Sequence, residues 1–315
     1  MKTRIAAALA VLACLSTIAL AQQYPTKPVR IVMTSGPDAL PRMVGRRLTE
    51  AWGQQLIIDP QGGGGGLMSG SVAAKAAPDG YTLLLATGSH TISPSFYKLP
   101  YDMVRDFDPI CLVATIPFLL VVNNTLPAKS VTEFIKLAKA RPGELNFGSG
   151  GNGSPGQLFA EMFKHMTGVN MVHIPYKALG YALTDVISGQ VQLMFTVGPL
   201  ALPQVKSGRV RALGVTTATR SRLMPEFPTL AESGVPGYDA MSWNGFLAPA
   251  GTPAAIIAKL HDEIAKAMNS AEIAEHVAQL GYEPTASTPQ ELGELIKSEL
   301  AKWAKVAQQA GLKPN

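Results

Sequence analysis

Short apolar runs alternate with helical segments along most of the chain, and no other feature limits the possible folds as strongly. Residues 29–33, 55–58 and 81–86 fit strands, while residues 38–52 and 67–77 between them fit helices. A strand–helix–strand order favours a parallel sheet with helices on its faces. The first part of the chain is therefore predicted to form an α/β lobe.

The loops that follow these strands are candidates for a binding site, because ligands of open α/β sheets bind beyond the carboxyl ends of the strands. They span residues 34–38, 59–66 and 87–91 and are expected on one rim. The candidate ligand-binding residues in the first and third loops are Ser35, Gly36, Asp38, Thr87, Ser89 and His90.

A second lobe is predicted because the same alternation returns later in the chain, and the length exceeds what one core usually serves. The apolar stretch at residues 110–123 is interpreted as a strand pair broken at Pro117. The later strands are expected at residues 171–174, 191–195 and 210–215, and helices at 130–140, 182–188, 202–207, 254–267, 271–280 and 289–310. The expected division is residues 22–123 plus 229–315 for one lobe and 124–228 for the other, with a hinged cleft between them.

The N-terminus has the pattern of a secretory signal peptide. Lys2 and Arg4 precede an apolar run at residues 5–20, and residues 19–21 offer a small-x-small cleavage site. Residues 1–21 are therefore predicted to be removed on export to the periplasm. The alternative is a lipoprotein anchored through Cys14, which would have an unusually short apolar run. No later stretch reaches the ~18 apolar residues that a membrane helix needs.

The charge and the cysteine content argue against nucleic-acid binding and against an intrachain disulfide in the chain that follows the predicted signal peptide. Lys2 and Arg4 provide two of the formal +5, so the rest of the chain carries +3 and gives no electrostatic case for nucleic-acid binding. The sequence has two cysteines, Cys14 in the predicted signal peptide and Cys111 in an apolar stretch. Cys111 is expected to be a buried, unpaired small hydrophobe.

A glycine-rich stretch at residues 146–157 leads into a predicted helix and is the strongest candidate for an anion site. Ser154 suits the N-cap and Pro155 the first helical position, and Gln157 would complete a capping box. Glycine lets a ligand approach the backbone, and a helix N-terminus presents free N–H groups. The amide of Gly156 and the loop amides before Ser154 are the expected donors. A plain strand-to-helix turn is the alternative.

Enzyme signatures fail in the same region. Asn152 stands where a Gly-x-Ser-x-Gly elbow around Ser154 would need its first glycine. No Gly-Lys-Ser/Thr follows the glycines, and the sequence has no Cys/His cluster or His-Glu-x-x-His motif. We therefore expect no enzyme activity, no catalytic residue, no metal site and no cofactor.

Several motifs in a fixed order carry a family resemblance. They include Ala76-Ala77-Pro78-Asp79-Gly80-Tyr81-Thr82-Leu83, Leu99-Pro100-Tyr101-Asp102, His173-Ile174-Pro175-Tyr176-Lys177, Gly189-Gln190-Val191-Gln192 and Ala248-Pro249-Ala250-Gly251-Thr252-Pro253. From Tyr24 to the C-terminus the chain resembles the periplasmic solute-binding proteins of tripartite tricarboxylate transporters, called Bug or TctC-type proteins.

This resemblance implies a two-lobed α/β fold of the type II-like periplasmic binding class, with two mixed or parallel sheets and a hinged cleft. It implies a small organic acid as ligand, either a di- or tricarboxylate or an aromatic carboxylate, held by backbone amides, hydroxyls and waters. The implied partners are one large and one small permease subunit, and the chain is expected to act as a monomer. The further site residues that the resemblance supports are Ser149, Gly151, Asn152, Ser154, Gly156, Tyr176 and Thr196.

Two stretches depart from the family pattern. The first loop, residues 34–38, is shorter than the family's Pro-Phe-x-x-Gly-Gly-x-x-Asp segment, although Asp38 still aligns with the family Asp. Many members have Asp-Asn where this chain has Thr196 and Val197, so a partner for a ligand amine is missing. A simple or aromatic carboxylate is therefore favoured over an amino acid, and the short loop leaves room for a longer or ring-containing acid.

Three functions remain as hypotheses at this point. The leading one is an extracytoplasmic protein that captures a carboxylate and delivers it to a membrane transporter. The second is a binding module of the same fold that signals to a membrane kinase. The third, a secreted α/β hydrolase, has the least support from the residues.

Overall fold

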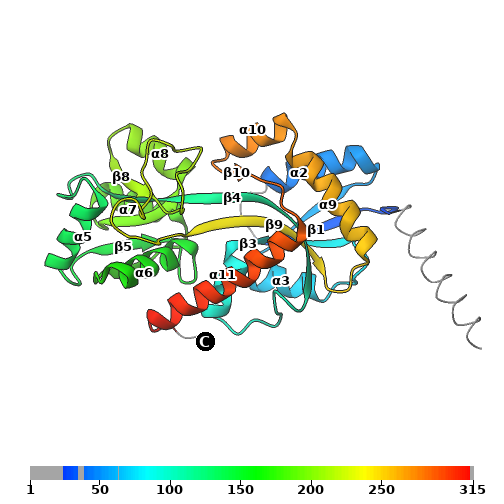
Figure 1. The fold of residues 1–315 in the computed structure, drawn as a ribbon, viewed down its shortest axis with the longest axis horizontal. Coiled ribbons are helices and arrows are strands. Elements are labelled where there is room, and N and C mark those ends of the chain that lie inside the picture. The colour runs from blue at the N-terminus through cyan, green and yellow to red at the C-terminus, as the bar shows by residue number, and fades with distance from the viewer. Residues whose placement is uncertain (1–23, 35–38, 63, 313–315) are drawn as a thin grey trace, which may run out of the picture.

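The computed structural model describes residues 24–34, 39–62 and 64–312 (Figure 1). The predicted signal peptide, Cys14 and the candidate site residues Ser35, Gly36 and Asp38 lie outside the described residues. Two α/β lobes lie side by side along the long axis of the molecule, and long strands run between them (Figure 1). None of the described helices is both long and apolar enough to cross a membrane.

Hydrogen bonds join the strands of the described residues into one sheet. They are β1 (Val29–Thr34), β2 (Leu56–Gln61), β3 (Thr82–Thr87), β4 (Phe107–Asn123), β5 (Asn146–Ser149), β6 (Val172–Pro175), β7 (Leu193–Val197), β8 (Val210–Val215), β9 (Met241–Pro249) and β10 (Glu283–Pro284). The order is β2-β1-β3-β9-β4-β7-β5-β6, with β8 and β10 also paired to β4. We call the part around β1–β3 the first lobe and the part around β5–β8 the second lobe.

The helices cover both faces of the sheet in each lobe. They are α2 (Ala39–Trp52), α3 (Leu67–Ala74), α4 (Gly88–Ile92), α5 (Val131–Ala140), α6 (Pro155–Thr167), α7 (Leu179–Ser188), α8 (Gly198–Lys206), α9 (Ala254–Met268), α10 (Ala271–Gln279) and α11 (Pro289–Gln309), with 3-10 turns at Gly64–Gly66 and Ser93–Ser95. Parallel pairing occurs within each lobe, whereas β9 and β4 run antiparallel to their neighbours. The predicted α/β class is confirmed, and the strands of the two lobes are joined through β4 and β9 into one mixed sheet.

Residues 110–123 form part of a single strand, so the interpretation as a strand pair broken at Pro117 is wrong. β4 continues from Phe107 to Asn123 and joins the two lobes. Pro117 is the last residue of its register with β9, and Phe118 is the first of its register with β7. The missing N–H of the proline therefore falls where the strand changes partners, and the strand needs no break there.

Apolar side chains on the two faces of β4 enter different cores. In the second lobe Leu119 and Val121 pack with α7 and α8, while Leu120 and Val122 pack with α5 and α6. This is the two-residue period of a strand that is buried on both faces. In the first lobe Cys111 is fully buried beside α2 and α9, as its apolar surroundings predicted.

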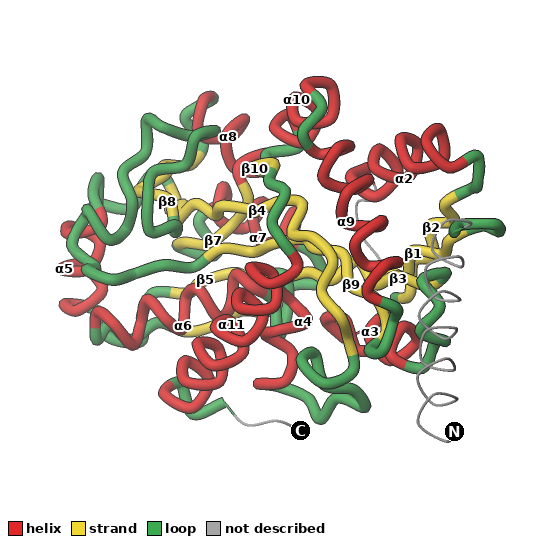
Figure 2. The backbone as a smooth tube through the Cα atoms, turned by 45° about the vertical axis from the view of Figure 1, so that its right-hand side comes forward, coloured by secondary structure: helices red, strands yellow, loops and turns green. Residues whose placement is uncertain are grey.

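The last helix, α11, connects the two lobes by packing. Its first half buries Leu292 and Ile296 in the core with Trp243, and its second half buries Trp303 in the core of the second lobe. The Trp303 ring stacks on Phe159 of α6, with ring centroids 5.4 Å apart and planes at 20°. Figure 2 shows α11 crossing in front of the strands that link the lobes.

Candidate functional site

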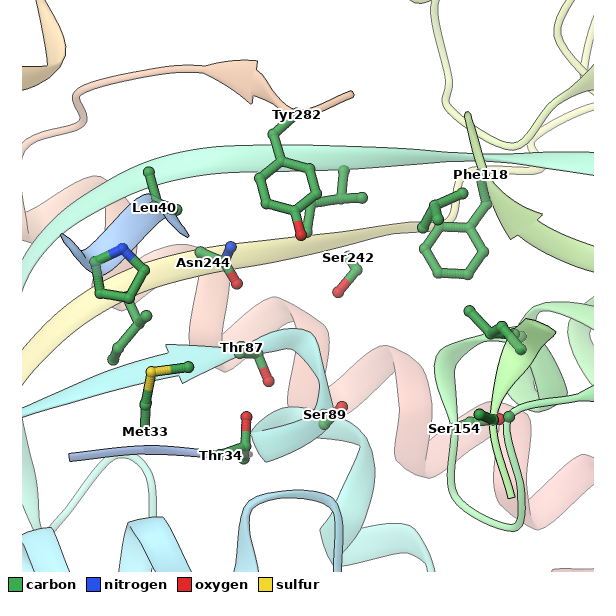
Figure 3. Close-up of a pocket in the computed structure, with 18 residues that line it drawn as sticks. Met33, Thr34, Leu40, Thr87, Ser89, Phe118, Ser154, Ser242, Asn244 and Tyr282 are labelled. Atoms are coloured by element: carbon green, nitrogen blue, oxygen red, sulfur yellow. The ribbon is translucent and has the colours of Figure 1, made fainter. Parts of the chain in front are cut away.

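A cavity of about 520 Å³ lies between the lobes, under the linking strands β4 and β9. Residues of both lobes and of the linking strands line it (Figure 3). They are Met33, Thr34, Leu40, Pro41, Leu85, Thr87, Ser89, Ile116, Phe118, Gly150, Ser154, Gly156, Ala178, Leu179, Val197, Ser242, Asn244 and Tyr282. The cavity thus contains four of the predicted site residues, Thr87, Ser89, Ser154 and Gly156.

The first-lobe wall is built at the carboxyl ends of two neighbouring parallel strands. Thr34 ends β1, Thr87 ends β3, and Ser89 is the second residue of the short helix α4. The register pairs Met33 with Leu85, so the ends of both strands reach the same rim. This is the position that the strand order predicted for the ligand-facing loops.

His90 lies behind this wall and does not line the cavity, so its placement gives no support to the ligand contact predicted for it. The side chain is fully buried, and burial lowers its pKa to about 4, which leaves the imidazole neutral near pH 7. Nδ1 accepts a hydrogen bond from the Thr87 amide at 3.0 Å. Nε2 therefore carries the proton and donates to Ser69 Oγ at 3.1 Å. His90 fixes the start of α4 and with it the direction of Ser89.

Among the glycines at residues 62–66, before α3, the structure explains why Gly66 must be a glycine. Its φ is +102°, and a Cβ there would lie 2.8 Å from the imidazole of His90. A side chain is therefore excluded both by backbone conformation and by space. The run serves the packing around His90, and none of its described residues lines the cavity.

On the second-lobe wall, Ser154 begins α6 as predicted, but the predicted capping box does not form. Ser154 has the extended backbone of an N-cap, yet its Oγ is buried and makes no hydrogen bond to any residue that the structure describes. Gln157 reaches past it, so that Oε1 accepts from the Gly153 amide at 2.8 Å. The loop around Gly153 is thereby held, and the Ser154 hydroxyl remains available at the cavity wall.

Two main-chain donors accompany this hydroxyl. The amides of Gly150 and Gly156 make no hydrogen bond within the described chain, whereas that of Gly151 donates to Ser149 Oγ at 3.1 Å. Gly156 also fits closely against β7, since a Cβ there would lie 2.8 Å from the Phe195 carbonyl oxygen. The wall therefore offers free N–H groups at the N-terminus of α6, where an anion is stabilised.

Five other predicted residues lie near this wall but outside the cavity lining. Ser149 is fully buried and shares a 2.7 Å hydrogen bond with Nε2 of His173. Tyr176 donates to Asp185 Oδ2 at 2.6 Å. The remaining three are Gly151, the exposed Asn152, and the buried Thr196, whose Oγ1 has no hydrogen-bond partner in the described part of the chain. Ligand contact at these positions stays a prediction.

Two polar residues on β9 were missed by the sequence reasoning. Ser242 and Asn244 are each 8% exposed, face the cavity, and make no side-chain hydrogen bond within the described chain (Figure 3). Trp243 between them points the other way into the core. The alternation of polar and apolar residues along this strand was the signal that could have found them.

Tyr282 also lines the cavity, from the side opposite the first-lobe wall (Figure 3). Its neighbours are held by the second lobe, because Glu283 Oε1 accepts from Ser221 Oγ at 2.6 Å and from the Arg222 amide at 3.0 Å. We call residues 281–283 the bridging segment. Burial raises the pKa of Tyr282, so the phenol is protonated and can donate a hydrogen bond.

The described lining of the cavity is polar and apolar but carries no charged side chain. The described residues that line the cavity include no Lys, Arg, His, Asp or Glu. No group of three or more His, Cys, Asp and Glu residues within the described ranges is arranged to hold a metal. Hydroxyls, one amide side chain and free backbone N–H groups can hydrogen-bond a small anion, and apolar walls can cover its body.

Sequence comparisons relate the chain to one family of proteins. The model of the family described as "Tripartite tricarboxylate transporter family receptor" matches residues 40–312. The chain is similar to protein BugT of Bordetella pertussis, with 34% identity over 93% of this chain and 92% of that protein. It is also 34% identical to a protein of Pseudomonas sp. strain P51, over 93% and 89% of the two chains.

Solved structures agree with this similarity. An R. palustris protein with adipate superimposes with a TM-score of 0.81 and 36% identity, over 93% of this chain and all of that one. The periplasmic binding protein BugD has a TM-score of 0.78 and 29% identity over 93% of this chain and all of its own. MatC from Rhodopseudomonas palustris with bound malate has a TM-score of 0.77 and 29% identity, over 90% of this chain and all of its own.

Proposed function

The chain belongs to the tripartite tricarboxylate transporter receptor family, and we propose that it captures a small carboxylate between its lobes and delivers it to a tripartite tricarboxylate-type permease. The observation that carries the proposal is the cavity between the lobes. Ser242, Asn244 and Ser154 present buried or nearly buried polar groups to it that have no partner among the residues that the structure describes. Buried polar groups cost free energy unless a ligand or water satisfies them.

The kind of ligand follows from the lining. Neutral donors, including the amides of Gly150 and Gly156, suit a carboxylate that must be released again, because no buried ion pair has to be broken. Two of the similar solved structures contain adipate and malate, which are both dicarboxylates. A periplasmic location and a permease made of one large and one small subunit are part of the same proposal.

Binding can be tested by thermal unfolding of the mature chain with citrate, malate, adipate, hexanoate and benzoate, and with amino acids as controls. A ligand at about 100 times its Kd should stabilise the protein by about 2.7 kcal/mol. Recovery of the unchanged ligand would distinguish binding from hydrolysis. No stabilisation by any carboxylate would contradict the proposal.

Delivery needs a separate test, because a binding module that signals to a membrane kinase would give the same thermal shifts. Deletion of the protein in its own cells should abolish uptake of the radiolabelled ligand. Normal uptake together with loss of a ligand-dependent transcriptional response would favour the sensing role.

A further inference from the structure

His173 lies outside the cavity lining but is joined to the second-lobe wall through the hydroxyl of Ser149. Its strand, β6, pairs with β5, and the register places His173 beside Phe147 on the strand that Ser149 ends. The two rings stack, with centroids 4.9 Å apart and planes at 24°. In this position Nε2 of His173 lies 2.7 Å from Ser149 Oγ, so the imidazole is held from both its face and its edge.

The Ser149 hydroxyl also contacts both polar groups of the Gly151 backbone. Its Oγ accepts from the Gly151 amide at 3.1 Å and lies 3.1 Å from the Gly151 carbonyl oxygen, to which it can donate. The same carbonyl accepts from the Ser154 amide at 3.2 Å. Hydrogen bonds therefore lead from His173 through Ser149 and Gly151 to Ser154, which lines the cavity.

The three contacts of this hydroxyl determine which nitrogen of His173 carries the proton. Burial and the nearby Lys164 lower the pKa of His173 to about 4, so the ring is neutral near pH 7 and has a single N–H. A hydroxyl donates one hydrogen and accepts at two lone pairs. All three contacts are hydrogen bonds only if Ser149 donates to the Gly151 carbonyl and accepts from the Gly151 amide and from Nε2–H of His173. His173 is therefore the donor.

Gly151 belongs to the loop that carries the free donors of the second-lobe wall. Its φ is +111°, and glycine has more accessible backbone conformations than any other residue, so its orientation depends on what holds it. Ser149 holds it at both its N–H and its C=O. On one side of it is Gly150, whose amide makes no hydrogen bond within the described chain, and further on is Ser154 at the start of α6. The orientation of Gly151 thus sets the directions of both neighbours at the cavity.

We infer that His173 is a positioning residue for ligand binding, which holds residues 150–154 in the orientation that presents their donors to the carboxylate. The inference rests on the proposed function and needs no contact between His173 and the ligand. Without this hydrogen bond the loop would have to be ordered when the ligand binds, and the lost conformational entropy would weaken binding.

Two substitutions of His173 separate its hydrogen bond from the packing of its ring. His173→Phe keeps an aromatic ring against Phe147 but removes the donor, whereas His173→Gln loses the ring but offers an amide N–H at a similar reach. The probe is the tightest-binding acid among citrate, malate, adipate, hexanoate and benzoate, measured by isothermal titration calorimetry. His173→Phe should bind it about tenfold more weakly than the wild type, and His173→Gln within about twofold of the wild type. His165→Phe is the matched control, because His165 is exposed on α6 and makes no hydrogen bond with the described residues.

Nitrogen-15 NMR of the wild-type protein near pH 7 tests the protonation of His173 without substitution or ligand. The ring signal that is missing from His173→Gln identifies the residue, and it should show the proton on Nε2. A proton on Nδ1 would overturn the inference, as would wild-type affinity in His173→Phe or a tenfold loss in His173→Gln. If His173→Phe no longer unfolds cooperatively, His173→Gln and the NMR signal decide. Binding of no acid by the wild type would contradict the proposed function itself.

Discussion

Several polar groups at the site are buried without a hydrogen-bond partner in the described residues, and this lowers the free energy of unfolding. Within the described residues, the Ser154 hydroxyl and the side chains of Ser242 and Asn244 have no hydrogen-bond partner although they are buried or nearly buried. The amides of Gly150 in the loop and Gly156 in the first turn of α6 have none there either. A chain selected for stability alone would pair or remove these groups, since each unsatisfied buried group costs about 1–3 kcal/mol. We propose that the free groups in the cavity lining are the ones that a ligand satisfies.

The Ser154→Ala variant should separate stability from binding. Removal of an unpaired hydroxyl should leave the free energy of unfolding unchanged or slightly higher, while ligand affinity falls by about 0.5–1.5 kcal/mol. Urea unfolding and calorimetric titration measure the two effects. Ser298→Ala on α11, where the hydroxyl donates to Leu295 O on an exposed face, is the control. Equal affinity in Ser154→Ala would remove this serine from the site. The neighbouring Gly156 is a poor target, because a Cβ would meet the Phe195 carbonyl.

His90 makes the stability of the protein depend on pH. Its pKa is lowered by burial from 6.5 to about 4, so the unfolded chain takes up a proton first as the pH falls. Stability should therefore decrease between about pH 6.5 and pH 4 by up to about 3 kcal/mol from this residue. His173, with its pKa lowered to about 4 by burial and by Lys164, acts in the same direction.

The His90→Gln variant should unfold with a shallower dependence on pH over this window, although it should be less stable than the wild type at pH 7. Urea unfolding at a series of pH values measures the slope. His173→Gln provides the comparison at a less buried histidine. A slope in His90→Gln as steep as that of the wild type would show that the buried imidazole does not control the effect.

Among the helices and strands, the sequence predicted those features that depend on neighbouring residues, such as helix caps and strand ends. Ser130 caps α5 by accepting from the Glu133 amide, and β1 and β3 end within a residue of the predicted limits. Capping and short apolar runs act within a few residues, so the sequence alone predicts them. The strand through Pro117 was missed because its continuity depends on partners far along the chain. The prediction of a capping box at Ser154 was wrong because the Gln157 side chain accepts a hydrogen bond from the Gly153 amide instead of the Ser154 amide.

For the site as well, the sequence predicted the residues that lie at the ends of predicted elements and missed a residue that only tertiary contacts position. Thr87, Ser89, Ser154 and Gly156 follow or begin elements that the sequence marks, and all four line the cavity. Tyr282 precedes a strand of two residues that exists only because β4 lies beside it. No periodicity signals such an element, so its contribution needs the tertiary structure.

The bridging segment should couple ligand affinity to the contact between the lobes. Glu283→Ala removes the acceptor for Ser221 and the Arg222 amide and frees Tyr282 to move away from the cavity. Affinity should fall by about 1.5–3 kcal/mol, the range for hydrogen bonds to a charged group. Glu294→Ala, on the exposed face of α11, is the matched control because its carboxylate bonds only Gln290 in the described chain. If both variants bind as the wild type does, the segment plays no part in binding.

At the scale of the whole molecule, the cavity draws its walls from both lobes, so its volume depends on how the lobes are placed. We propose that residues 22–123 plus 229–315 and residues 124–228 move as two bodies about β4 and β9. Small-angle X-ray scattering should then show a smaller radius of gyration with saturating ligand than without it. An identical scattering curve in both states would indicate a preformed site, in which the ligand enters without closure.

The course of α11 has a consequence for how long a ligand stays bound. Because Leu292 and Ile296 are anchored in one core and Trp303 in the other, any opening must bend this helix or slide its indole over Phe159. If the lobes open as proposed, we expect this aromatic contact, which lies outside the cavity lining, to slow ligand release. Mutations on this helix, remote from the chemistry of recognition, should accordingly change the dissociation rate and leave the selectivity among acids as it was.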